Sequence, residues 1–496
     1  MEQEEDGNMT EKAAGARLRT ALEQVAFGDD SPDSYGRNQR VTKHLPPEVT
    51  SGMLYRDVVR IAWPSFVELM LTQLASMVDL MMVGSLGAWA LTAVGLTTQP
   101  KFLMMTMFMA MNVGATALVA RYKGANNPEK ANMIMRQALL LTLVLSAIAS
   151  FIGYLFSRPM VQFMGASDIQ SLEGGTIYLQ IQMVGFVFMA LTSTITAVLR
   201  GIGDSRTAMV YNLVANIVNV ILNYLLIYGH GGFPRMEVAG ASLATILGQF
   251  VAFLLAMAAV LRGRGYLHLR LKDSFRPDKE ALFNIFNIGL PAMAEQLLMR
   301  VGMIIYSKTV AGLGTVPFAT HQVCMNIQAL SFMSGQAFAV SATSLMGQSL
   351  GKKRPDMAQA YCDRTRRIGM IIAIGIGISF ALFGGQIVAL YNDDPQIVEM
   401  GATVLLLVAV MQPLQSSQFI IAGALRGAGD TRVTAVITFI TVLLVRPLAA
   451  ILMIEGLHWG LIGAWVAMGL DQLLRSILVF LRYYSGKWKS IRLKQE

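Results

Sequence analysis

The sequence contains 496 residues, of which 54% are hydrophobic and 14% are charged, and its mean hydropathy is +0.51. Soluble domains average about 45–50% apolar and about 25% charged residues, so the composition excludes an ordinary soluble protein and indicates one that crosses a membrane many times. The formal net charge of +9 does not indicate nucleic-acid binding, because the basic residues lie between apolar stretches and do not form one patch.

The N-terminal segment, residues 1–51, is polar, carries charges of both signs and contains no long apolar run. A segment of this kind cannot bury enough apolar surface to become ordered, so we predict a disordered cytosolic segment. A secretory signal is not recognisable there, because the basic start, the apolar core and the cleavage site are all missing.

Twelve apolar stretches follow, and each is long enough to supply the about 20 residues that cross a bilayer. Their centres lie near Leu71, Thr106, Leu143, Phe188, Val218, Phe250, Leu298, Phe332, Ile374, Ala409, Val442 and Met468. Basic residues gather in alternate loops and favour the cytosolic side, so both termini are predicted to be cytosolic. We expect a multi-pass monomer in the plasma membrane, which would be the inner membrane of a bacterium.

A polar linker divides these spans into two lobes. The predicted N-lobe covers residues 52–261, the linker 262–283 and the C-lobe 284–484, and a basic cytosolic tail follows at 485–496. Each lobe contains six of the twelve spans, and an even number of spans returns the chain to the side from which it started.

The two lobes are copies of one another. An ungapped alignment that starts at Pro64 and Pro291 pairs Glu68 with Glu295, and further along LRGIGDSR in the first copy matches LRGAGDTR in the second. Since both copies enter the membrane in the same sense, they form a parallel repeat. The predicted fold class is an all-α membrane protein with twelve transmembrane helices in two six-helix lobes, related by a pseudo-twofold axis along the membrane normal.

The two matching loops are interpreted mainly as turns. Their glycines permit a tight turn with positive φ, and the aspartates that follow, Asp204 and Asp430, are suited to cap the next helix. Arg200 and Arg426 stand in the last turn of the preceding helix, where a positive charge complements the helix dipole.

Two carboxylates lie within the first span, at Glu68 and Asp79. Eleven residues at about 100° each return to within about 20° of the starting direction, so these two acids and Thr72 share one helix face. A charge at membrane depth costs at least about 2.5–3.5 kcal/mol, so this face is predicted to turn towards partners or a wet cavity. Glu295 occupies the equivalent place in the second lobe.

Several motifs together resemble the multidrug and toxic compound extrusion (MATE) family of secondary transporters. They are VDLMMVG (78–84), VARYKGANNPEKA (119–131), NVILNYLLIYG (219–229), GQSLGKKRP (347–355) and the two LRGxGDxR loops. The resemblance extends over about residues 54–482. It implies two lobes around a V-shaped cavity, and export of cationic or amphipathic drugs against an inward flow of H⁺ or Na⁺.

The resemblance also implies roles for single residues. Asp79 matches a first-helix aspartate implicated in cation coupling, and Asn219 with Asn223 matches a fifth-helix polar pair whose second member is Asp in one proton-linked branch. Other branches have a glutamate where Met299 stands here, and Glu295 lies one turn earlier. The aspartate of sodium-linked members falls near Gln415 in this sequence, so H⁺ is favoured over Na⁺.

The candidate residues fall into two groups. Those predicted to bind the coupling cation or the substrate are Asp79, Glu295, Glu68, Asn219 and Asn223. Those predicted to line the cavity are Thr72, Gln73, Lys101, Asn112, Arg300, Tyr306, Asn326 and Gln336.

Each of these candidates has a structural alternative. Glu68 could pair with Lys101, and Tyr306 could be a buried residue that needs one hydrogen bond instead of a ring that stacks on cationic drugs. Asp471 and Arg475, spaced i,i+4 in the last span, are predicted to form a local ion pair.

Two other functions were weighed. A flippase for a lipid-linked oligosaccharide or cell-wall precursor, from the same superfamily, would need cations to meet pyrophosphate, and the sequence supplies Lys101, Arg300, Lys308 and Arg446. An enzyme is not supported, because HExxH and nucleophile-elbow motifs are missing. Cys324 and Cys362 form no CxxC pattern, and neither a metal site nor a cofactor is predicted. The expected partners are small molecules and the lipid bilayer.

Overall fold

The computed structural model describes residues 49–166, 168–262 and 265–493. Nearly all of the N-terminal segment predicted to be disordered lies outside this part, as does the end of the predicted basic tail. The described residues form helices and contain no β-strand, which confirms the all-α fold class.

Six spans make up the N-lobe. They are α2 (Ser51–Gly84), α3 (Ala88–Gly124), α4 (Pro128–Leu155), α6 (Ile169–Val184) joined to α7 (Phe186–Gly201), α8 (Ser205–Tyr228) and α9 (Val238–Leu261). A short helix, α5 (Ser157–Phe163), precedes α6. The axes of α6 and α7 are bent by 53° at Gly185, so these two helices form one broken span.

Six spans also make up the C-lobe. They are α10 (Lys279–Ala311), α11 (Thr315–Gly351), α12 (Pro355–Ala389), α13 (Pro395–Gly427), the composite run Thr431–Gly456 and α16 (Gly460–Tyr484). The composite run consists of α14 (Thr431–Thr438), α15 (Arg446–Ile451) and two π-helical stretches, η2 (Phe439–Val445) and η3 (Leu452–Gly456). Among the described residues, eleven of these twelve helical segments are long and apolar enough to cross a membrane, and α11 is the exception. Every apolar stretch predicted from the sequence has its centre inside one of the twelve segments.

The helix ends largely follow local sequence signals. Asn127 caps α4 by accepting a hydrogen bond from the Lys130 amide at 3.1 Å, with Pro128 in the first turn. Asp204 caps α8 as predicted and accepts from the Thr207 amide at 3.2 Å. The same prediction is wrong for Asp430, which makes no cap hydrogen bond to α14. Its carboxylate accepts instead from Nε of Arg482 at 2.7 Å, because a guanidinium is a stronger partner than a backbone amide.

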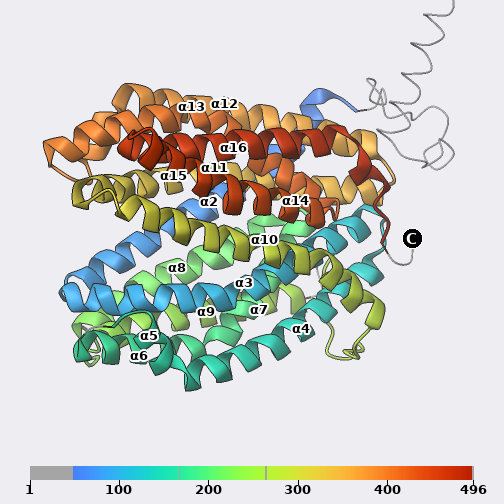
Figure 1. Ribbon diagram of the computed structural model, residues 1–496. Coiled ribbons are helices and arrows are strands. Elements are labelled where there is room, and N and C mark those ends of the chain that lie inside the picture. Colours follow the sequence, from blue (N-terminus) through green and yellow to red (C-terminus); the bar gives the residue numbers. More distant parts are fainter. Residues whose placement is uncertain (1–48, 167, 263–264, 494–496) are drawn as a thin grey trace, which may run out of the picture.

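The two lobes lie side by side, with the C-lobe helices α11 to α16 on one side of Figure 1 and α3 to α9 on the other. Helices α2 and α10 cross between them, α2 packing on α11 of the C-lobe and α10 on α3 of the N-lobe. The lobes meet where the two LRGxGD loops lie, and we call this end of the molecule the closed end.

Contacts at the closed end occur in pairs that follow the repeat. The Ser341 hydroxyl donates to the Val58 carbonyl at 2.9 Å, and at the equivalent place in the other copy Gly114 lies directly against the Ile285 carbonyl. The alignment of Pro64 with Pro291 makes Gly114 the counterpart of Ser341. Two equivalent contacts in opposite copies require an approximate twofold axis between lobes of the same orientation, as predicted.

A second pair of contacts brings backbone against backbone. Gly124 at the end of α3 lies against the carbonyl of Gln348, and Gly351 at the end of α11 lies against the carbonyl of Arg121. A Cβ at either glycine would overlap the opposing carbonyl, so only glycine allows this approach.

Candidate functional site

The Asp79 carboxylate is held by amide side chains from one neighbouring helix. Asp79 lies on α2, and Asn223 of α8 donates a hydrogen bond to it from Nδ2. Asn219, one turn earlier on α8, has its side-chain amide 2.8 Å from Asp79 Oδ1 and donates to it when the amide nitrogen faces the carboxylate. In that orientation the Asn219 oxygen accepts from the Thr245 hydroxyl of α9 at 3.1 Å. The structure therefore brings together three residues that the sequence placed in one site.

The charges around Asp79 are more distant than these amides. Among the residues that the structure describes, no lysine or arginine nitrogen lies within 4.0 Å of its carboxylate. Lys101 of α3 interacts with Asp79 through its charge at longer range. Asp79 is thus a carboxylate with neutral hydrogen-bond donors in contact and a cation nearby.

Glu68 has a different environment on the same helix. It is buried, and its Oε2 lies 2.8 Å from Nη2 of Arg200, while Oε1 accepts from the Asn212 amide at 2.7 Å. The partner considered from the sequence was Lys101, but the structure supplies Arg200 from the LRGIGD loop. The arginine reaches back from the end of α7, so this loop provides an ion pair as well as a turn.

Glu295 repeats this arrangement in the C-lobe. It is buried on α10, and its Oε1 accepts from Nη2 of Arg426 at 2.7 Å. Arg426 stands in the LRGAGD loop, at the place that corresponds to Arg200. Arg200 and Arg426 were not predicted as ion-pair partners. The signal that could have identified them is that both copies contain this glutamate together with this arginine.

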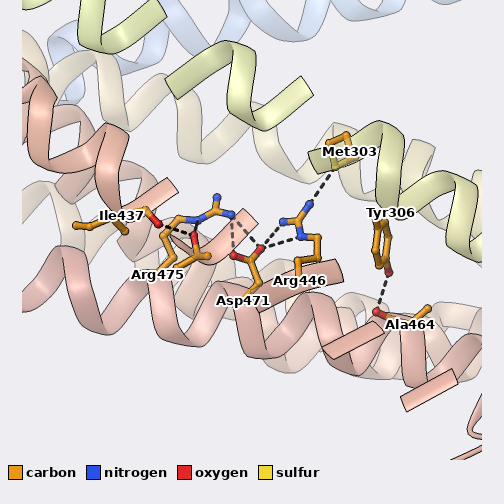
Figure 2. A network of polar contacts seen from close by, with 8 residues as sticks. Met303, Tyr306, Ile437, Arg446, Ala464, Asp471 and Arg475 are labelled. Atoms are coloured by element: carbon orange, nitrogen blue, oxygen red, sulfur yellow. Dashed lines mark hydrogen bonds and ion pairs between the residues drawn. The ribbon is translucent and has the colours of Figure 1, made fainter. Parts of the chain in front are cut away.

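A further buried ion cluster lies in the C-lobe around Asp471 of α16 (Figure 2). Nη2 of Arg475 lies 2.9 Å from its carboxylate, which confirms the predicted i,i+4 pair. Arg446 of α15 also pairs with Asp471, through Nε at 2.9 Å and through Nη2. The remaining Arg446 nitrogen, Nη1, lies 3.0 Å from the sulfur of Met303. This carboxylate is fully buried and lies between two guanidiniums, whose positive charges face it.

Several residues predicted to line the cavity are engaged in other contacts. Asn112 is buried, donates to Ser193 and accepts from Thr194, both at 2.9 Å. Tyr306 is fully buried and its hydroxyl donates to the Ala464 carbonyl at 2.7 Å (Figure 2). These contacts correspond to the structural alternatives considered for polar residues in membrane helices.

The other predicted residues are more accessible. Thr72 is exposed and accepts from the Asn216 amide at 3.1 Å. The guanidinium of Arg300 on α10 stacks over the ring of Phe102 on α3 at 3.6 Å, which joins the two lobes. Gln73 and Gln336 are half-buried and Asn326 is exposed.

Sequence comparison identifies relatives that extend along most of this chain. The family model described as MatE matches residues 64–225 and 291–451, the corresponding part of each lobe. A probable multidrug resistance protein, NorM of Thermotoga maritima, is 27% identical over 447 residues, covering 90% of this chain and 96% of that protein. The multidrug resistance protein PmpM of Pseudomonas aeruginosa is 29% identical over 395 residues, covering 77% and 80%.

Solved structures share the fold. One is the outward-facing conformation of a multidrug resistance MATE family transporter, with a TM-score of 0.82, 22% identity and coverage of 90% of this chain and 100% of that one. Another is a MOP superfamily transporter from Pyrococcus furiosus, with a TM-score of 0.82, 23% identity and coverage of 88% and 97%. These structures contain twelve helices in two lobes, as found here. Because the family model matches both halves and more than half of the sequence, the chain belongs to the MatE family of membrane transporters.

Proposed function

We propose that this protein exports cationic or amphipathic small molecules across the plasma membrane in exchange for protons, as a monomer with both termini in the cytosol. The substrate class is supported by relatives named as multidrug resistance proteins. The orientation is supported by the basic loops, because basic residues favour the cytosolic side and the LRGxGD loops of the closed end are among these loops.

The observation that carries the choice of proton site is the contrast between Asp79 and three buried carboxylates in the spans, Glu68, Glu295 and Asp471. Glu68, Glu295 and Asp471 each contact a guanidinium, whereas Asp79 is held by the amides of Asn223 and Asn219. Protonating a paired glutamate would leave a half-buried arginine without its counter-charge, which is unfavourable. Protonating Asp79 leaves no guanidinium unpaired, so it is the carboxylate best suited to load and release a proton in each cycle.

Asn219 and Asn223 fit both protonation states of Asp79. An amide nitrogen donates to the carboxylate, and an amide oxygen accepts from the protonated acid after the side chain rotates. In the proposed cycle, ionised Asp79 binds the cationic substrate or keeps its site available. A proton arriving from outside neutralises Asp79 and releases the substrate there. The lobes then rock to open the cytosolic side, where the proton leaves.

Glu68 and Glu295 contribute to this proposal as the ion pairs that hold each lobe's first helix to the end of its fourth span. We predicted from the sequence that either could act with Asp79 in coupling. In the proposed mechanism they act through position, because each keeps its arginine neutralised inside the membrane.

The flippase alternative is weaker. Of the four cations that could meet a pyrophosphate, Arg446 is buried against Asp471, and the charge of Lys101 is opposed by Asp79. Arg300 and Lys308 remain, one of them stacked on Phe102 and the other exposed. Two separated cations form a poorer pyrophosphate site than a convergent cluster.

Reconstituted liposomes test the proposal directly. Ethidium or a norfloxacin-like drug should accumulate when a proton gradient is imposed, and the response should collapse when the gradient is removed. Asp79→Asn, whose side chain resembles the neutral acid, should lose gradient-driven transport and should bind the cationic drug more weakly. Asp168→Asn is the matched control, because Asp168 is an exposed helix cap at which the same acid is changed to its amide. Transport that follows a Na⁺ gradient at constant pH would reassign the ion, and normal transport by Asp79→Asn would remove the site.

A further inference from the structure

The segment that follows α16 packs against the rest of the protein. Residues 487–493, which we call the strap, begin with a 3₁₀ turn at Lys487–Ser490 and run along the closed end (Figure 1). From its composition the sequence indicated only a basic tail. In the structure three of its seven side chains, those of Trp488, Lys489 and Leu493, are buried.

The first part of the strap is anchored in the C-lobe. Trp488 is fully buried, stacks on Tyr483 of α16 with ring centroids 5.7 Å apart, and donates from Nε1 to the Tyr483 carbonyl at 2.7 Å. Lys489 donates from Nζ to the side-chain oxygen of Gln359 on α12 at 2.9 Å. An indole that is buried and hydrogen-bonded in this way contributes as much as a core residue, so this part moves with the C-lobe.

The second part of the strap reaches the N-lobe. Arg121, in the last turn of α3, donates from Nη2 to the carbonyl of Ile491 at 2.7 Å. Leu493 is 8% exposed and belongs to the apolar cluster built from α3, α4, α7, α8 and α9 of the N-lobe, together with the start of α10. The strap therefore bridges both lobes within a few residues.

The N-lobe attachment sits beside the glycine contact of the closed end. Arg121 binds the strap with its side chain, and its own carbonyl is the group against which Gly351 of the C-lobe is pressed. Opening the closed end separates Gly351 from Arg121. The same displacement moves Arg121 away from a strap that is anchored on the C-lobe, so the lobes cannot part there while both attachments of the strap remain.

We propose that residues 487–493 act as a clasp that holds the closed end shut, and that its N-lobe attachment at Arg121 and Leu493 must detach before the molecule can open to the cytosol. The proposal depends on the rocking of the two lobes in the proposed function but not on the identity of the coupling ion or of the substrate. The clasp would then help to set the relative populations of the state open to the outside and the state open to the cytosol.

Cysteine accessibility at the closed end provides the test. Ser344 is fully buried and donates to the Gly201 carbonyl of the opposite lobe at 2.9 Å. In a background without Cys324 and Cys362, Ser344→Cys should react with a maleimide only when the closed end opens. The measurement uses purified full-length protein in detergent without substrate or gradient, so its failure is distinct from failure of the transport proposal.

Leu493→Ser should speed the labelling of Ser344→Cys about tenfold, because it removes a buried attachment to the N-lobe. Trp488→Ala should do the same from the C-lobe end. Lys487→Ala is the matched control, since Lys487 is an exposed residue of the same segment, and it should leave the rate unchanged.

Two results would overturn the clasp. The first is a labelling rate for Leu493→Ser that equals that of Lys487→Ala. The second is faster labelling in Trp488→Ala alone together with a lower melting temperature, which would make Trp488 a packing residue of the C-lobe and nothing more.

Discussion

The two lobes agree in one set of polar residues and differ in another. Both keep a buried glutamate on the first helix paired with an arginine at the end of the fourth span. They differ about three helical turns further along the same helix, where the N-lobe has Asp79 and the C-lobe has Tyr306 at the equivalent position. The tyrosine is fully buried and bonded to a backbone carbonyl, whereas the aspartate is half-buried and held by amides.

This difference separates architecture from chemistry. A feature that both copies need in order to fold is present twice, and the Glu–Arg pair and the glycine contacts of the closed end belong to that class. A group that has to change its charge during transport is needed once. The amide-held Asp79 occurs in one copy alone among the described residues, which is why we assign the proton to it.

The largest effect on stability is expected when only one of the two partners of an ion pair is replaced. Glu68→Gln and Glu295→Gln each leave a half-buried arginine without its counter-charge, and each should lower the free energy of unfolding by about 1.5–3 kcal/mol, the usual worth of a hydrogen bond to a charged group. Denaturation in mixed detergent micelles measures this. Because the pairs are equivalent, the two losses should be similar, and a loss confined to one lobe would break the comparison.

A control for that prediction replaces both partners. Glu295→Gln combined with Arg426→Gln removes both charges at once and should recover a substantial part of the stability lost in Glu295→Gln. If the double variant is as unstable as the sum of its single variants, the two side chains do not act as a pair.

The next effect concerns the closed end. Gly124→Ala and Gly351→Ala each place a methyl group against an opposing carbonyl and should disfavour closure by about 1–3 kcal/mol, the usual cost of overpacking. Faster labelling of Ser344→Cys would report the shift. Gly375→Ala is the matched control, because a Cβ there meets nothing within 4 Å. If the two substitutions changed the labelling rate to different extents, the two glycine contacts would not contribute equally to the stability of the closed end.

A smaller effect is expected at the C-lobe counterpart of Asp79. Tyr306→Phe removes one buried hydrogen bond to the Ala464 carbonyl, which lies within α16, and should cost about 0.5–1.5 kcal/mol of stability. Gradient-driven transport by the folded fraction should persist. Transport lost to the same extent as in Asp79→Asn would place Tyr306 in the transport mechanism and contradict the distinction between the lobes.

The smallest effect is a pH dependence at the strap. Burial lowers the pKa of Lys489 to about 7, although the nearby charges of Asp363 and Asp356 oppose that shift. A detached strap would restore the ordinary pKa of 10.5, so attachment releases protons and strengthens as pH rises above about 7. The ratio of attached to detached strap should rise by up to about tenfold per pH unit between pH 7 and pH 9. A spin label at exposed Ser490 should therefore become less mobile over this range.

Lys489→Met should abolish this pH dependence, and Lys487→Met, at an exposed lysine of the same strap, should preserve it. A spin-label spectrum that does not change with pH in the unaltered protein would show that attachment of the strap is not linked to the Lys489 proton.

Most of the fold could be predicted from the sequence, because membrane spans depend on local composition and the repeat is visible in Pro64, Pro291 and the two LRGxGD loops. The Asp471–Arg475 pair was predictable for the same reason, since i,i+4 spacing is local. The cap assigned to Asp430 was wrong because Arg482, distant in sequence, competes for the carboxylate.

The candidate site was predictable only in part. The sequence grouped Asp79, Asn219 and Asn223 through their family resemblance, and the structure brings them into contact. The helix face alone did not distinguish Asp79 from Glu68, and among the physical observations only the tertiary partner of each separates them. The packing of the strap was not predicted, because the sequence interpretation considered only its basic residues. The burial of Trp488 and Leu493 depends on tertiary contacts that the charge pattern does not reveal.

The backbone contacts at Gly124 and Gly351 also bear on how efficiently the gradient is used. At these two crossings the helices touch without intervening side chains, so no chain of water molecules can thread between them. In the proposed cycle, a proton bound at Asp79 would find no water path between the helices at these crossings while the lobes are closed. We expect these two glycines to limit proton leakage that is not coupled to substrate transport.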